Sequence, residues 1–189
     1  MAKAQVLTLT ALIKLVNLDG AYLVGYAWLF GMSIWISFFG GVIAFQTLPR
    51  HQFGSLQHKI FPIYFVQSIV LSASLLGTWI FKHPDVMMHL ARPNVADVAQ
   101  AYALATVLFS QGFNYFVIGP MTSRTMFQRH KLEKEEGKTY NEPGVSADMK
   151  ALNRRFGMLH GISSLANLGA IIALGFHGLW IGNAGVKGY

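Results

Sequence analysis

The sequence has no cysteine, and only 12% of its residues are charged. Without cysteine the chain can form no disulfide bond, no thiolate zinc site and no thiol redox centre. A typical soluble domain has about 25% charged residues, roughly twice the share found here. The chain is also 53% hydrophobic. This composition is typical of a membrane protein, and it excludes an ordinary soluble globular domain.

Sequence signatures of several function classes are missing as well. The net charge is +7, but the Lys and Arg residues lie between apolar runs and form no aromatic-interleaved basic face, so we predict no nucleic-acid partner. The sequence has no phosphate-binding loop, no Gly-x-Ser-x-Gly motif and no paired carboxylates at a membrane edge. We therefore predict that the protein is not an enzyme.

The N-terminal residues do not resemble a removed targeting segment. The apolar run at residues 6–13 is followed by Lys14 and Asn17 rather than by a small-residue cleavage site, which argues against a signal peptide. A mitochondrial presequence would be richer in arginine and free of acid, whereas this segment ends in Asp19. We expect an endomembrane or plasma-membrane protein rather than a mitochondrial one.

Four long apolar stretches dominate the chain. About twenty apolar residues in a helix cross the hydrocarbon core of a bilayer, and none of the four carries Asp, Glu, Lys or Arg at its centre. We predict one all-α domain over residues 1–189, a four-helix transmembrane bundle. The predicted spans are residues 21–48, 60–81, 95–118 and 156–181.

Two segments outside the spans have features of their own. Apolar residues recur near helical spacing before the first span, which predicts either a short amphipathic helix in the membrane interface or an extension of that span. They are Val6, Leu9, Leu12, Ile13 and Val16. A long charged loop joins the third and fourth spans at residues 119–155. Its charges alternate in sign at residues 131–136, so we expect a solvated helix that continues the third span past Pro120.

The basic residues predict an orientation. Four spans place both termini on one side and the loops 49–59 and 119–155 on the other. The loop side carries Arg50, Lys59, Arg124, Arg129, Lys131, Lys134, Lys138, Lys150, Arg154 and Arg155, against Lys3, Lys14, Lys82, Arg92 and Lys187 on the terminal side. Lys and Arg accumulate in cytoplasmic loops. We therefore expect cytosolic loops and lumenal or extracellular termini.

Small and polar residues recur inside the spans. Small residues at helical spacing let helix backbones approach closely, so we assign helix packing to Ser33, Ser37, Gly41, Gly157 and Gly161. Larger polar residues in the third and fourth spans have two interpretations, because they could either hydrogen-bond between helices or line a polar cavity. The residues that would line such a cavity are Ser110, Asn114 and Asn167.

The histidines do not predict a metal or haem site. Of the seven histidines, only His160 and His177 lie within a predicted span. They are on the same helix, about 25 Å apart by helical rise, so they cannot share one iron. We predict no metal site and no cofactor.

Two motifs carry a family resemblance. LPRHQFGSLQHKIFPIYF at residues 48–65 and RRFGMLHGISSLANLGA at residues 154–170 resemble segments of the transmembrane protein 205 family. The resemblance implies a four-helix membrane protein of no agreed biochemical activity. The animal member of that family is linked to vesicle traffic and to platinum-drug resistance, but this chain has no cysteine through which a thiol-based mechanism could act.

The motifs also contain the candidate site. We predict that their polar residues form a cytosolic-facing site for an anionic lipid headgroup or a partner protein; the alternative is that they lock the turn between the first two helices. The site residues are Arg50, His51, Lys59, His160 and Asn167. The predicted function is a structural, accessory or trafficking-related component of a membrane assembly, in contact with the lipid bilayer and other subunits. The alternative is a small transporter or permease with a polar cavity.

Overall fold

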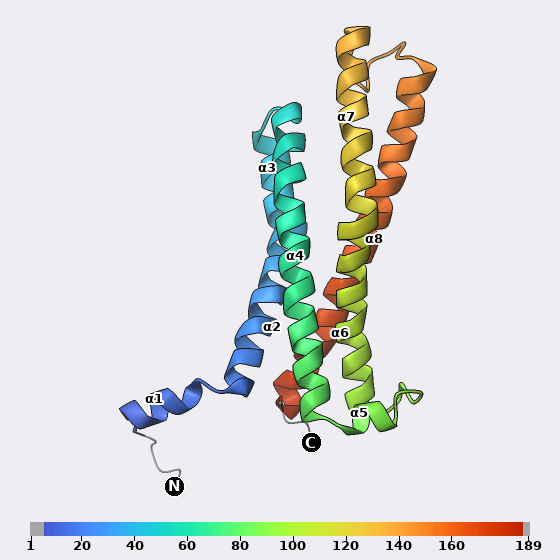
Figure 1. Cartoon of the computed structure of the whole chain (residues 1–189). Helices are drawn as coiled ribbons and strands as arrows, with labels where there is room; N and C mark the ends of the chain where they lie inside the picture. Colours follow the sequence, from blue (N-terminus) through green and yellow to red (C-terminus); the bar gives the residue numbers. More distant parts are fainter. Residues whose placement is uncertain (1–5, 187–189) are drawn as a thin grey trace.

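The computed structural model describes residues 6–186, and within them the chain forms helices and no strand (Figure 1). Four helical rods are long and apolar enough to cross a membrane, which confirms the predicted four-span bundle. The first rod comprises α2 (Leu18–Ile34), η1 (Trp35–Gly40) and α3 (Gly41–Thr47), and the second is α4 (Arg50–Lys82). The third comprises α6 (Ala96–Phe113), η2 (Asn114–Ile118) and α7 (Gly119–Glu136), and the fourth is α8 (Ala147–Ala184).

The rods run alternately up and down, so the bundle has two distinct ends (Figure 1). The α3–α4 and α7–α8 connections lie at one end, which we call the hairpin end. The start of α2, the short helix α5 (Asp85–Met88) and the end of α8 lie at the other, the terminal end. The hairpin end carries the predicted cytosolic loops. Its sidedness stays a prediction, and Lys3 and Lys187 lie outside the described residues.

The predicted loop at residues 49–59 is wrong. Arg50 is already the first residue of α4, and only Leu48 and Pro49 separate α4 from α3. Proline cannot continue the incoming helix, and its fixed φ, here −53°, suits the position before a new one. The sequence predicts a loop here because hydropathy marks only where a helix enters hydrocarbon, and a polar helical turn outside that region leaves no hydropathy signal.

The predicted loop at residues 119–155 is largely helical too. The expected continuation of the third span past Pro120 is confirmed, because α7 extends to Glu136. The fourth rod starts at Ala147, capped by the Ser146 side chain, which accepts a hydrogen bond from the Met149 N–H. The third rod has 41 residues, which is about 60 Å at 1.5 Å per residue and twice the thickness of a hydrocarbon core. The α7–α8 hairpin therefore extends well beyond the apolar parts of the rods.

The N-terminal amphipathic segment is a separate helix. It forms α1 (Leu9–Leu15), with the Thr8 side chain as its N-cap, and Asn17 then caps α2. In Figure 1, α1 points away from the bundle. This arrangement excludes a simple extension of the first span. The leucines of α1 are exposed in the described chain, so α1 has the form expected of a helix in the membrane interface.

The core of the terminal half is apolar around one buried histidine. Leu29, Trp79 and Leu174 are fully buried there. His177 on α8 is also inaccessible; its Nε2 lies 2.6 Å from the hydroxyl of Tyr22 on α2, and its Nδ1 lies 2.9 Å from Oε1 of Gln100 on α6. The ring therefore joins three rods, with the Gln100 carbonyl as acceptor of one bond and the other made to the tyrosine hydroxyl.

Substitution of His177 should destabilise the bundle. His177→Ala removes both hydrogen bonds and leaves a buried cavity, so we expect a loss of about 2 to 4 kcal/mol in the free energy of unfolding. The measurement is equilibrium unfolding in mixed micelles. His160→Ala on the same helix is the control, because His160 is exposed. Equal stabilities of the two variants would contradict the assigned role of His177.

Candidate functional site

A group of polar side chains connects the four rods near the middle of the bundle. We call it the Asn167 node, and its members are Ser33, Ser37, Tyr64, Gln111 and Asn167. The Asn167 amide donates to Ser37 Oγ at 2.6 Å, and its Oδ1 accepts from Tyr64 at 2.7 Å and from Gln111 Nε2 at 3.0 Å. Tyr64 also lies 3.2 Å from Ser33 Oγ. One side chain on α8 thus bonds to η1, α4 and α6.

Both π-helical segments lie beside this node. Ser37, the acceptor of the Asn167 amide, is in η1. Asn114 begins η2 and donates through Nδ2 to the Ser163 carbonyl of α8 at 3.2 Å. A π turn widens a helix and redirects its side chains, and such turns are frequent at functional sites. In both rods the irregular turn brings a polar side chain to α8.

A second cluster lies at the hairpin end, outside the apolar parts of the rods. We call it the hairpin-end cluster; it comprises Arg50, His51, Arg129, His130, Glu133 and Tyr140. Arg50 donates to Oε1 of Glu133, and the Tyr140 N–H donates to the same oxygen at 2.7 Å. The Arg50 guanidinium also lies 3.9 Å from the centre of the Tyr140 ring. The start of α4 is thereby joined to α7 and to the α7–α8 connection.

The cluster extends to α8 through aromatic contacts. The Arg129 guanidinium lies 4.3 Å from the Tyr140 ring centre and 4.6 Å from that of Phe156. Asn153 donates to the Tyr140 carbonyl at 2.7 Å. Burial raises the pKa of the Glu133 carboxyl, but the hydrogen bonds from Arg50 and Tyr140 outweigh it, so the pKa lies below its usual value. Glu133 is therefore an anion at neutral pH.

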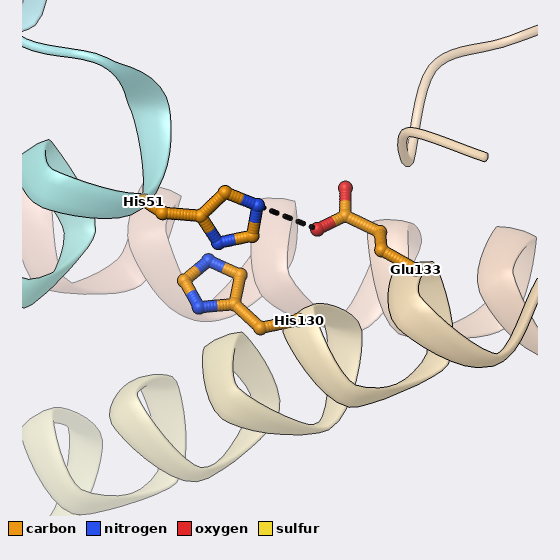
Figure 2. A group of neighbouring side chains, drawn as sticks. All are labelled: His51, His130 and Glu133. Atoms are coloured by element: carbon orange, nitrogen blue, oxygen red, sulfur yellow. Dashed lines mark ion pairs between the residues drawn. The ribbon is translucent and has the colours of Figure 1, made fainter. Parts of the chain in front are cut away.

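Two histidines lie against this carboxylate. Figure 2 shows His51 reaching from α4 toward His130 and Glu133 on α7. His51 Nε2 is 3.7 Å from Glu133 Oε2, and the two imidazole centres are 4.3 Å apart. One possible ligand atom from each of the three residues lies within 4.8 Å of the others. Two imidazoles and a carboxylate are ligands that bind divalent transition metals.

The five predicted site residues do not form one site. Arg50 and His51 meet in the hairpin-end cluster, whereas Lys59 lies on an exposed part of α4, more than 10 Å farther by helical rise. His160 is exposed and stacks on Phe156. Asn167 lies about 10 Å beyond His160 along α8, in the node. The Arg50 charge is paired with Glu133, so binding of a headgroup by Arg50 would require that pair to open.

The turn between the first two rods is held by other residues than expected. Phe45 on α3 and Phe53 on α4 pack edge to face, with ring centres 5.4 Å apart. Arg50 and His51 instead contact α7. Gly54 permits this approach, since a Cβ there would lie 2.9 Å from Met126 Sδ and 3.4 Å from His130 Cε1.

The five residues assigned to helix packing also differ in their surroundings: some lie between rods and others are exposed. Ser33 is buried and Ser37 bonds to Asn167, so both lie between rods. Gly41 is partly buried, and a Cβ there would come close only to the Ile36 carbonyl of its own rod. Gly157 and Gly161 are exposed, and a Cβ at either would meet no described atom within 4 Å. A side chain at either position would therefore touch no other rod within residues 6–186.

The sequence does not predict several members of these sites, among them His130, Glu133 and Tyr64. His130 and Glu133 are three residues apart on one helix, a spacing that puts two possible ligands on one face. Glu133 lies within the charge run at residues 131–136 and His130 directly precedes it, and such a run predicts only a solvated helix. Tyr64 belongs to the first motif, which predicts no role for it in the bundle centre. Its hydroxyl lies in the Asn167 node, although tyrosine in an apolar span has an obvious need for a hydrogen-bond partner.

Fold and sites define a four-span helical membrane protein with a polar centre and a charged end. A family model described as "Domain of unknown function (DUF4149)" matches residues 24–131, and the chain belongs to that family. Transmembrane protein 205 of Danio rerio is 25% identical over 158 residues, which cover 77% of this chain and 80% of the relative. The predicted kinship with the transmembrane protein 205 family is confirmed. No solved structure matches.

The Asn167 node should determine how stable the four-rod bundle is. Asn167→Ala leaves the polar groups of Ser37, Tyr64 and Gln111 without their common partner, so we expect a loss of about 1 to 3 kcal/mol in the free energy of unfolding. The measurement is equilibrium unfolding in mixed micelles. Asn183→Ala is the matched control, because exposed Asn183 bonds only to the Leu179 carbonyl of its own helix. A larger effect of the control would contradict the role of the node.

Proposed function

We propose that the protein is a non-catalytic structural or accessory component of a membrane assembly, with its hairpin end in the cytosol of an endomembrane or plasma-membrane system. The observation that carries this proposal is the Asn167 node. Its amide is shared among all four rods, at Ser37, Tyr64 and Gln111, so the polar groups at the bundle centre hold helices together. A bundle fixed in this way is suited to present its outer surface to a partner.

The exposed face of α8 supports a partner that is itself a membrane helix. Gly157, Gly161 and Ser164 lie on that face, and a Cβ at either glycine would meet open space. Small residues allow two helix backbones to approach closely within a bilayer. His160 is exposed beside them and could donate or accept a hydrogen bond across such a contact.

Site-specific photo-crosslinking tests the α8 face. A photo-crosslinking residue in place of Leu165, beside Ser164, should give one discrete adduct with another membrane protein in intact membranes. The same residue in place of Phe109 on α6 should give none, although the two side chains are similarly exposed, at 71% and 73%. Gly161→Leu should abolish the adduct by filling the contact, whereas Gly77→Leu, on an open face of α4, should preserve it. Adducts from both positions, or from neither, would count against the proposal.

A carrier is the second candidate, and specific atoms favour it. The buried oxygens Gln111 Oε1 and Asn114 Oδ1 have no hydrogen-bond partner within residues 6–186. Buried polar atoms normally find a partner, which can be ordered water. Both residues lie near the η2 turn, so a polar pathway in the bundle would pass beside them.

The absence of native cysteine makes this alternative testable by labelling. If the bundle centre is closed, Asn114→Cys should react with a water-soluble thiol reagent as slowly as Leu104→Cys, which replaces a fully buried apolar residue. Ser55→Cys, at an exposed position of the hairpin end, is the accessible control. Labelling of Asn114→Cys at the rate of Ser55→Cys would reject a closed centre and favour the carrier.

A further inference from the structure

One oxygen of the hairpin-end cluster has no hydrogen bond. The Glu133 side chain is only 6% exposed. Its Oε1 accepts from Arg50 and from the Tyr140 N–H, but Oε2 is buried and has no hydrogen-bond partner within residues 6–186. His51 Nε2 is the facing group, and at 3.7 Å it is too far for a hydrogen bond. A buried carboxylate oxygen without a donor is unfavourable, so Oε2 is a vacant acceptor for a cation.

Both histidines next to this oxygen can supply a lone pair. None of the described residues hydrogen-bonds to a ring nitrogen of His130 or of His51. The two ring nitrogens of an imidazole include one acceptor when the ring is neutral, so each histidine can offer a nitrogen to an ion. A neutral imidazole is the form that binds metal. The His51 side chain is 54% exposed, which gives an ion access from solvent.

We propose that His51, His130 and Glu133 form a binding site for one divalent transition-metal ion, with Zn²⁺ as the best fit. The ligands come from two helices, His51 from the first turn of α4 and the other two from one face of α7. Two histidines and a carboxylate are the protein ligands of many zinc sites that keep a fourth position open. The ion would link the start of the second rod to the projecting part of the third.

The geometry requires only a small adjustment. Zinc binds nitrogen and carboxylate oxygen at about 2.0 to 2.2 Å, so its ligand atoms stand roughly 3.3 Å apart in a tetrahedral site. The three ligand atoms here lie within 4.8 Å of one another. His51 is the most exposed of the three, and rotation of its side chain can bring its nitrogen closer to the other two ligand atoms.

The two neighbouring arginines affect both the charge at the site and the orientation of Glu133. Positive charge opposes a cation, but Arg50 is paired with Glu133, and the Arg129 guanidinium lies over the Tyr140 and Phe156 rings. Arg50 and the Tyr140 N–H bind Oε1, so they fix the carboxylate with Oε2 toward the histidines. Such partners of a ligand orient it and raise metal affinity.

Metal titration of the whole chain tests the site. The chain is purified in mild detergent, stripped with a chelator and titrated with Co²⁺, whose visible absorption reports coordination by the protein, followed by displacement with Zn²⁺. We expect one Co²⁺ per chain, displaced by Zn²⁺. His130→Ala should weaken Co²⁺ binding by at least about 10- to 100-fold, the range seen even for loss of a partner that only orients a ligand.

Matched variants separate the site from non-specific binding and from misfolding. His58→Ala removes a histidine from the same helix as His51, outside the cluster, and should bind Co²⁺ like the unsubstituted chain. His51→Ala changes an exposed side chain, so it should fold normally, as checked by circular dichroism, and still lose affinity. The proposal is overturned if the unsubstituted chain binds no stoichiometric Co²⁺, or if His58→Ala weakens binding as much as His51→Ala.

Discussion

The bundle depends on the hydrogen bonds that Asn167 makes to the other three rods. Inside a bilayer no water is available to a polar side chain, so each must find a partner within the protein. Ser37, Tyr64 and Gln111 all meet at this one amide. Rotation of any rod by a single residue turns its side chains by about 100° and would leave several of these groups unpaired. Apolar packing alone favours association less specifically, because lipid tails are as apolar as leucine.

The two ends of the bundle extend this arrangement with different chemistry. Toward the terminal end, His177 likewise joins several rods through one side chain, because it bonds to Tyr22 and Gln100 in an otherwise apolar core. Toward the hairpin end, charges replace neutral polar groups, because the rods there leave the hydrocarbon. Arg50 and Glu133 can be ionised at that level, where their desolvation is less unfavourable than at the membrane centre.

Hydropathy predicts the spans well because it measures the apolar character that a helix needs to lie in hydrocarbon. It does not predict the ends of the rods, where residues 50–59 and 147–155 are helical but polar. The candidate site is predictable only in part for the same reason. Arg50 and His51 are recognisable as polar residues at a span boundary, but their partners His130 and Glu133 are far away in sequence. Their meeting depends on how far α7 continues as a helix, and that length cannot be read from apolar periodicity.

The same geometry makes the hairpin end the adjustable part of the molecule. At the node, every rod is held by short bonds between neutral groups. The projecting α7–α8 hairpin rises past the α3–α4 turn (Figure 1), and the only ion pairs that join it to α4 within the described residues are those of Arg50 and His51 with Glu133. Glu133 is thus the common partner of both contacts. A ligand of the Glu133 Oε2 atom would therefore act on the ion pairs that join the α7–α8 hairpin to α4. The hydrogen bonds of the Asn167 node would meanwhile keep the four rods in register.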